Sequence, residues 1–451
     1  MTAGSPDLLD IAAGVVSRAR DGEGVEAYVA RSRSTEIRAY EGQVESLSSA
    51  ESLGVGVRVV VDGRQGFAYA GSLEPAAVAE ALDAARDNAE FASPDPWLVL
   101  AGPDDVAPAE LHVFDPAVDT TPTEHKVQMA LELEAALRRS DSRITGIESA
   151  DYFDAIGEAA LASTTGIAVE SRATRAGLST FALATDTAGA QVGFGWSVGR
   201  GPGVLDIEAA AAAAATRATR MLGATKPDST RCTVVLDPLV TSMFLGIIGS
   251  TLSGEAVNKG RSLFAGRLDQ EVASSLITLV DDPTDPEAFA ASAFDGEGIA
   301  SRRNVLIGAG TLRGYVHNAS SAARVGTKST GNAVRGGHAS IPGVGCRALT
   351  LTPGQQSPED IYRSIGEGIL IGSVSGLHSG VNPVSGDFST GAEGVRIRNG
   401  ELAEPVREFT IGSTLQRMLQ DTIAVGSDIE RVPGTAAGVS LAIEGVSVGG
   451  R

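Results

Sequence analysis

Cysteine and histidine are scarce in this sequence. Its 451 residues include two cysteines, Cys232 and Cys346, and five histidines. The cysteines are far apart and belong to no close-spaced Cys/His cluster, so neither a disulfide framework nor a zinc knuckle is indicated. No apolar run reaches the roughly 18 residues of a membrane span, and the N-terminus lacks a basic stretch of the signal-peptide type. We therefore expect a cytoplasmic protein without a membrane partner.

Basic residues are also in the minority. Lys and Arg total 36 against 56 Asp and Glu, which gives a formal charge of −20, and no segment concentrates the basic residues. Such a surface repels phosphate groups, so nucleic acid and anionic membranes are not expected partners. Hydrophobic residues make up 43% and charged residues 20%, as in ordinary globular proteins. The length suggests about two to three domains.

The first half of the chain predicts helices around an antiparallel meander. Ser5-Pro6-Asp7 is typical of a helix start, and period-two alternation follows from Val25 to Ala70, with turns at Glu41-Gly42 and Asp62-Gly63. Strands joined so tightly must be antiparallel. Phe194 and Trp196, among alternating glycines, are expected in a core aromatic cluster. The other predicted helices are 75–89, 122–139 (with Thr121-Pro122-Thr123-Glu124 as a capping box) and 207–222, and the other predicted strands are 144–150, 155–164, 167–174 and 177–184.

The second half is predicted to be strand-rich. Lys226-Pro227-Asp228 interrupts the pattern, so we place a boundary between an N-terminal α+β domain, 1–225, and a C-terminal domain, 226–451. The C-terminal part opens with a strand at Cys232–Leu236 and an apolar helix from Leu239 to about Leu252. The fold class expected is α+β, with a mostly antiparallel, barrel-like C-terminal domain.

A glycine-rich loop between 374 and 409 contains polar residues that suggest chemistry. His378, Asp387 and Ser389 are the residue types of a hydrolase triad, in which a base activates a Ser nucleophile and a carboxylate orients the base. Polar residues in such loops more often bond their own backbone, and that interpretation is favoured here. An acid/base centre made of His338 and Glu297 is a further alternative. Spacing alone does not establish that any of these side chains meet.

Five stretches resemble the TldD/PmbA family, also called modulator-of-gyrase proteins. They are GVGVRVVVDGRQGFAY (54–69), RSLFAGRLDQEVASSLITLVDD (261–282), FDGEGIASRRNVLIGAGTLRGY (294–315), STGNAVRGG (329–337) and GVNPVSGDFSTGAEGVRIRNGELAEPV (380–406). The resemblance covers most of the chain in order, and the last stretch is the most specific. It implies a two-domain fold and a role in a heterodimeric peptidase.

The resemblance also implies where a metal site would be. TldD-like members have an HExxxH motif on the helix before 261–282 and a Cys near the C-terminus, which together would bind zinc and a water. In this sequence the motif positions are Leu245, Gly246 and Ser250, and no His occurs between His125 and His317. The chain therefore resembles the PmbA (TldE-like) branch. No cofactor is expected in this chain, and zinc is expected in a TldD-like partner.

Three functional hypotheses remain open from the sequence. The favoured one is a non-catalytic subunit that forms a peptide chamber with its TldD-like partner, and a homodimer is the alternative assembly for the isolated chain. Residues expected to contact substrate are His338, His378, Asn382, Asp387 and Ser389. The second hypothesis is a stand-alone hydrolase that uses the loop residues. The third is a non-enzymatic binding protein, for which direct DNA contact is disfavoured by the charge.

Overall fold

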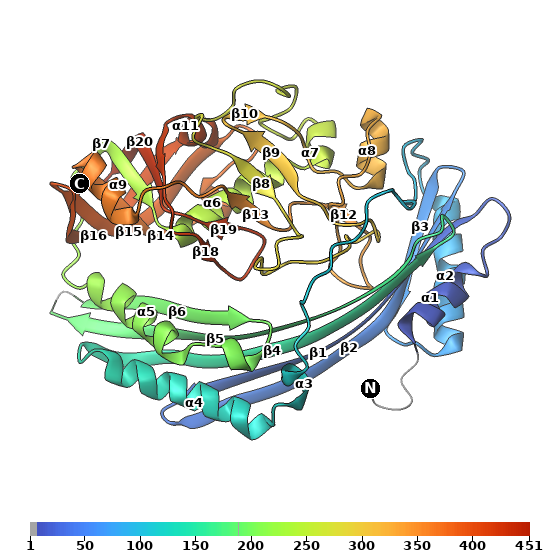
Figure 1. The fold of residues 1–451 in the computed structure, drawn as a ribbon, viewed down its shortest axis with the longest axis horizontal. Helices are drawn as coiled ribbons and strands as arrows, with labels where there is room; N and C mark the ends of the chain where they lie inside the picture. The colour runs from blue at the N-terminus through green and yellow to red at the C-terminus, as the bar shows by residue number, and fades with distance from the viewer. Residues whose placement is uncertain (1–6, 188) are drawn as a thin grey trace.

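The protein consists of a curved sheet with helices on its outer face and a barrel that lies within the curve (Figure 1). The structure is a computed structural model, and it describes residues 7–187 and 189–451. We call strands β1–β6 with their helices the sheet region, and everything from β7 onward the barrel region. Within the described ranges, no helix combines the length and apolar character that crossing a membrane requires.

The sheet region contains a six-stranded antiparallel sheet in the order β3-β2-β1-β4-β5-β6. The β1–β2 and β2–β3 connections place Glu41 and Asp62 at positive φ, each followed by a glycine, as tight hairpin turns require. The predicted meander and both turns are therefore confirmed. The strands are β1 (Gly24–Tyr40), β2 (Gln43–Val61), β3 (Arg64–Ala70), β4 (Ile144–Ser163), β5 (Ala168–Asp186) and β6 (Gly189–Gly199).

Helices cover the convex face of this sheet and leave its concave face toward the barrel region (Figure 1). The alanine-rich α5 packs closely on β6, because Gly193 and Gly195 offer no Cβ to hold it away. Asp7 caps the first helix and Asp206 caps α5. The helices are α1 (Leu8–Val16), α2 (Pro75–Phe91), α3 (Ala117–Thr120), α4 (Thr123–Ser140) and α5 (Ile207–Arg220), with a 3₁₀ turn at Pro202–Val204.

Three local predictions differ from the structure. The segments 144–150 and 155–164 form one continuous strand, as do 167–174 and 177–184, because sheet pairing continues across polar residues that break the sequence pattern. Thr121 does not cap α4, since its hydroxyl bonds the Ala117 carbonyl instead. Ser5 and Pro6 of the predicted first-helix start lie outside the described residues, and the observed cap is Asp7.

The aromatic prediction is also corrected. Phe194 and Trp196 stack with their ring centroids 5.3 Å apart. They are only half-buried and are absent from the hydrophobic core clusters, and the neighbouring Phe181 is exposed. On β6, Gly193 and Gly195 face α5, so the alternating residues Phe194 and Trp196 point to the opposite face of the sheet.

The barrel region confirms the expected α+β class with a barrel-like C-terminal part. Five strands close on themselves in the order β16-β15-β14-β7-β20, because β16 also pairs with β20 through Thr410–Gly412. Only the β7–β14 pair among these is parallel. The strands are β7 (Thr230–Leu236), β14 (Gly368–Ser375), β15 (Asp387–Arg398), β16 (Glu401–Thr414) and β20 (Leu441–Gly449), and β17 (Thr422–Val425) extends the sheet beyond β20.

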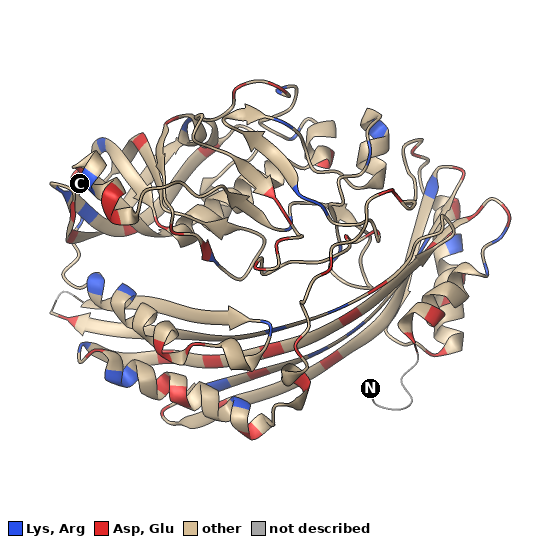
Figure 2. Cartoon of the chain, viewed as in Figure 1, with Lys and Arg blue, Asp and Glu red and all other residues tan. Residues whose placement is uncertain are grey.

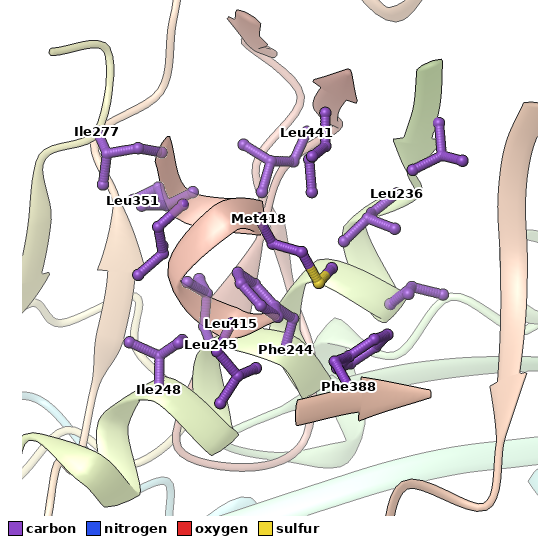
Figure 3. Packing of buried hydrophobic residues seen from close by; sticks show 14 of the residues in the cluster. Leu236, Phe244, Leu245, Ile248, Ile277, Leu351, Phe388, Leu415, Met418 and Leu441 are labelled. Atoms are coloured by element: carbon purple, nitrogen blue, oxygen red, sulfur yellow. The ribbon is translucent and has the colours of Figure 1, made fainter. Parts of the chain in front are cut away.

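One large apolar core holds the barrel region together (Figure 3). Helix α6 (Pro238–Thr251) packs into it through Phe244, Leu245 and Ile248, and α11 (Leu415–Gln420) adds Leu415 and Met418. The opposite side of the strands packs against α9 (Pro358–Ile365), whose N-terminus has a capping box formed by Ser357 and Asp360. Burying an apolar side chain of this size contributes about 1.5–3 kcal/mol.

Smaller elements complete the barrel region and connect it to the sheet region. A second sheet has the order β10-β9-β8-β13. The segment 92–116 has almost no regular structure and runs from α2 across the barrel region to α3, and we call it the strap (Figure 1). The remaining elements are α7 (Gly254–Asn258), α8 (Ala319–Val325), α10 (Leu377–Gly380), β8 (Leu279–Asp281), β9 (Asn304–Gly308), β10 (Thr311–Leu312), β11 (Ala333–Val334), β12 (Gly343–Val344), β13 (Leu349–Leu351), β18 (Glu430–Arg431) and β19 (Ala437–Gly438).

Charged residues of both signs are interspersed over both regions (Figure 2). Two ion pairs attach the strap to the barrel region, one between Asp95 and Arg324 and one between Asp104 and Arg302. Ser320 also accepts a hydrogen bond from the strap residue Val99, at 3.3 Å. The strap therefore ties the two regions together along their length.

Candidate functional site

The positions that correspond to the HExxxH motif lie on α6. Leu245 is fully buried in the apolar core, Gly246 has no side chain, and the Ser250 hydroxyl donates to the Ile247 carbonyl. None of these can supply a nitrogen, thiolate or carboxylate ligand to zinc. Across residues 7–187 and 189–451, no group of three or more His, Cys, Asp or Glu side chains could hold a metal ion. The residues present on α6 therefore do not fit a zinc site.

The loop that suggested a triad is held by its apolar residues. Leu377, Val381 and Phe388 pack on the barrel core, while the alternating side chains of Asp387 and Ser389 remain exposed. His378 is exposed on the one-turn helix α10.

The polar groups of this loop bond locally. Asn382 accepts from the amides of Val384 and Ser385 at 2.9 and 3.2 Å, and Asp387 accepts from the Ser385 hydroxyl at 2.6 Å. In the described chain no hydrogen bond joins any two of His378, Asp387 and Ser389.

His338 lies on the other glycine-rich loop and contacts the sheet region. Its ring makes an edge contact with Tyr69, with centroids 6.2 Å apart. A methyl group on Gly54 would come within 2.5 Å of that ring, and one on Gly56 within 2.1 Å of the His338 carbonyl oxygen. These two glycines of β2 therefore allow the loop to approach the sheet.

A cleft of about 720 Å³ opens between the sheet and the barrel region beside this loop. We call it the main cleft. Its walls come from β1, β4 and β5, from strap residues 109–113, and from barrel segments 291–294 and 335–339. A smaller cavity of about 240 Å³ shares Tyr28, Glu170 and Phe294 with it. Cavities of this size accommodate small ligands or short peptides.

Four charged residues meet beneath these cavities, and we call them the charged seam. Glu26 accepts from Arg58 at 2.7 Å and from Arg335 at 2.5 Å, and Arg58 also reaches Glu297 at 3.3 Å. Glu297 additionally accepts from the Ala319 amide at 2.9 Å. All four side chains are buried. The pairs Arg58–Glu297 and Glu26–Arg335 join the sheet region to the barrel region, and the pair Glu26–Arg58 connects these two.

The two carboxylates of the seam have opposite electrostatic environments. Burial raises the pKa of Glu297 to about 7, although Arg58 opposes this, and the nearby Glu26 carboxylate raises it further. Burial also acts to raise the pKa of Glu26, but Arg58 and Arg335 together outweigh it and lower that pKa. Glu26 pairs with two arginines, Arg58 and Arg335, whereas Glu297 pairs only with Arg58, which it shares with Glu26. No hydrogen bond links Glu297 to His338 in the described residues.

The seam and the main cleft were missed by reasoning from the sequence. One signal was available, because Glu26 and Arg58 each interrupt an otherwise apolar strand, and a charge on a buried strand face requires a partner. Nothing in the sequence indicated that the partners would be Glu297 and Arg335, more than 200 residues away.

Three family models match the chain: PmbA/TldA metallopeptidase domain 1 at residues 25–89, the central domain at 116–222, and the C-terminal domain at 229–450. The predicted boundary at 225/226 falls between the second and third of these ranges, and we keep it as a prediction.

Individual relatives agree with the family models. Metalloprotease PmbA of Escherichia coli O157:H7 is 27% identical over 90% of this chain and 88% of its own length. A modulator of a DNA gyrase from Thermotoga maritima has a TM-score of 0.89 at 24% identity, covering 97% of this chain and 99% of that chain. TldE from Thermococcus kodakarensis has a TM-score of 0.87 at 24% identity, covering 98% and 99%. With three models matched along most of its length, the chain belongs to the PmbA/TldD metallopeptidase family.

Proposed function

We propose that this chain is the non-catalytic, PmbA/TldE-like subunit of a heterodimeric zinc metallopeptidase in the cytoplasm. The observation that carries the proposal is α6, where Leu245 is a buried core residue and neither Gly246 nor Ser250 offers a metal ligand. A TldD-like partner would supply the zinc and the residues that activate water. This chain would complete the chamber in which a peptide or an unfolded segment binds.

In this proposal the polar loop residues shape the chamber wall. His338, His378, Asn382, Asp387 and Ser389 are the candidates for substrate contact. The exposure of the last four supports that role, as does the position of His338 at the main cleft. Helix α10 and strand β15 hold the exposed loop against the barrel core.

Reconstitution tests the proposal directly. The purified chain is expected to show no peptidase activity alone, and to gain activity when mixed with an HExxxH-bearing homologue encoded in the same genome. A chelator should abolish that activity, and replacing the motif Glu of the homologue by Gln is the matched control that retains the complex but removes the general base. Chelator-resistant hydrolysis by the isolated chain would contradict the proposal.

The same complex separates this proposal from a stand-alone hydrolase. Removing a triad nucleophile or base lowers kcat by several orders of magnitude. His378→Ala and Ser389→Ala in this chain are expected to leave kcat of the complex within a few-fold of the wild type. A loss of a thousandfold or more would show that this chain performs the chemistry.

A further inference from the structure

The strap forms a side wall of the main cleft. Strand β6 pairs with β5 only from Ala176 onward, so residues 168–175 are an open edge at which the sheet ends. Strap residues 109–113 line the cleft, and the Val113 carbonyl accepts from the Thr174 amide of this edge at 2.9 Å. The strap therefore closes the cleft on the side where the sheet has no further strand.

The strap is anchored on both sides of its middle part. Before the middle part, Ala101 is buried in an apolar cluster, and Asp104 pairs with Arg302 of the barrel region. After it, the Asp115 amide donates to the Thr174 hydroxyl at 2.8 Å. The middle part is therefore held at one end by the barrel region and at the other end by β5.

The middle part itself, residues 105–112, is weakly held, and we call it the gate. Among the described residues its only hydrogen bond runs from the Val106 amide to the Asp104 carboxylate, at 3.2 Å. Ala109 and Leu111 are half-buried, the other six gate residues are exposed, and none of the eight belongs to a hydrophobic core cluster. A segment with so few buried contacts and hydrogen bonds opens at a low cost in free energy.

We propose that residues 105–112 move away from the main cleft while both anchors remain attached, and that this movement controls which molecules enter from the side of β5. The closed gate admits small solutes only, and the open gate admits larger ones. The Asp104–Arg302 pair limits the movement, because it fixes the residue directly before the gate. The inference concerns entry alone, so it does not depend on the proposed function.

The first test measures how fast a thiol inside the cleft is labelled. Ala293→Cys, in a Cys232→Ala/Cys346→Ala background, places a single thiol on the cleft wall. The probes are a small maleimide and a maleimide attached to a bulky polymer, each referred to its rate with free cysteine. The intact chain is expected to react much more slowly with the bulky probe, because that reaction requires the gate to open.

A variant without the Asp104–Arg302 pair should open more often. Arg302→Gln is expected to speed labelling by the bulky probe about threefold, which is the effect of losing one partly exposed ion pair. Arg303→Gln is the matched control, because this neighbouring arginine lies 3.8 Å from Asp282 of the barrel region and should leave that rate unchanged. The small probe should react equally with both variants.

The second test cuts the gate. Glu110 is exposed and is the only glutamate of the gate, which contains no Lys or Arg. A glutamate-specific protease is expected to cut the native chain first after Glu110, since exposed and weakly held segments are preferred cleavage sites. The cut chain should react with the bulky probe faster than Arg302→Gln does. Glu110→Gln is the control that should resist this cut.

Four outcomes would overturn the inference. Equal rates of the two probes with the intact chain would mean that the cleft is open without any movement of the gate. An unchanged rate of the bulky probe in Arg302→Gln would mean that the ion pair does not limit entry. Absence of the cut after Glu110, or an unchanged rate after it, would mean that residues 105–112 are a fixed wall or no barrier. None of these measurements requires a partner subunit, so failure of the reconstitution would leave the gate standing.

Discussion

The apolar core around α6 and the charged seam are both closed to solvent, yet they contain opposite kinds of side chain. Around α6, Phe244, Leu245 and Ile248 belong to one large cluster of buried apolar residues. In the seam, two glutamates and two arginines replace such contacts at the junction between the sheet and the barrel. An apolar core tolerates some change in shape, whereas a buried charge network is stable only if every charge retains its partner.

The largest expected effect is in the seam. Arg58→Met leaves Glu297 without a cation and removes one of two from Glu26, so we expect a loss of about 3–5 kcal/mol in the free energy of unfolding. Urea denaturation measures the loss. Arg33→Met removes an exposed ion pair with Asp119 instead and should cost at most about 1 kcal/mol. Equal losses for the two variants would mean that burial of the seam has no energetic consequence.

The next effect is in the α6 core. Leu245→Ala removes a fully buried side chain and should cost about 2–5 kcal/mol, from lost burial and the cavity that remains. Met243 is on the same helix but 40% exposed, so Met243→Ala should stay within about 0.5 kcal/mol in the same urea titration. If Leu245→Ala were as mild as Met243→Ala, this helix position would not be a core position.

The smallest effect depends on pH. Glu297 has a pKa raised to about 7 in the folded protein, against 4.5 for an ordinary Glu, so the folded state binds the proton more tightly than the unfolded state. The resulting stabilisation is fully present below about pH 4.5 and is lost as the pH rises through about 7. Glu297→Gln cannot titrate, so the stability of the wild type relative to this variant should fall between pH 5 and pH 8.

Thermal unfolding at several pH values measures this difference. The control Glu36→Gln replaces an exposed residue of β1 and should give no such pH trend. A wild type whose stability relative to Glu297→Gln rises with pH would show that Arg58 dominates over burial at Glu297.

The sequence predicted the α6 core better than the seam for a physical reason. The apolar run from Leu239 to Leu252 indicates a buried helix locally, so this core could be inferred without coordinates. The fold class and the barrel were inferred from the strand patterns of the second half, and the motif positions Leu245, Gly246 and Ser250 from the resemblance to the TldD/PmbA family. The seam depends on residues 26, 58, 297 and 335 meeting in space, and such pairing has no local pattern. Strand lengths were underestimated for a similar reason, because the pairing of β4 with β5 extends through polar residues that resemble turns.

The candidate site was likewise only partly predictable from the sequence. The polar loop residues from His378 to Ser389 could be named from their types and their glycine-rich surroundings. The main cleft could not, since its walls come from stretches that lie far apart in the sequence. The open edge of β5 is visible only once the extent of β6 is known, because the sequence gives no indication that pairing begins at Ala176.

The strap and the seam together affect how such proteins can recombine. The strap belongs to the first part of the sequence but bonds Arg302, Ser320 and Arg324 in the second. A chimera that joins the first part of one relative to the second part of another at residue 226 would therefore inherit one partner from each parent in every ion pair that crosses this point. The two parts would be interchangeable only between parents that share these pairings. A junction at residue 226 therefore does not separate two parts that can be exchanged independently.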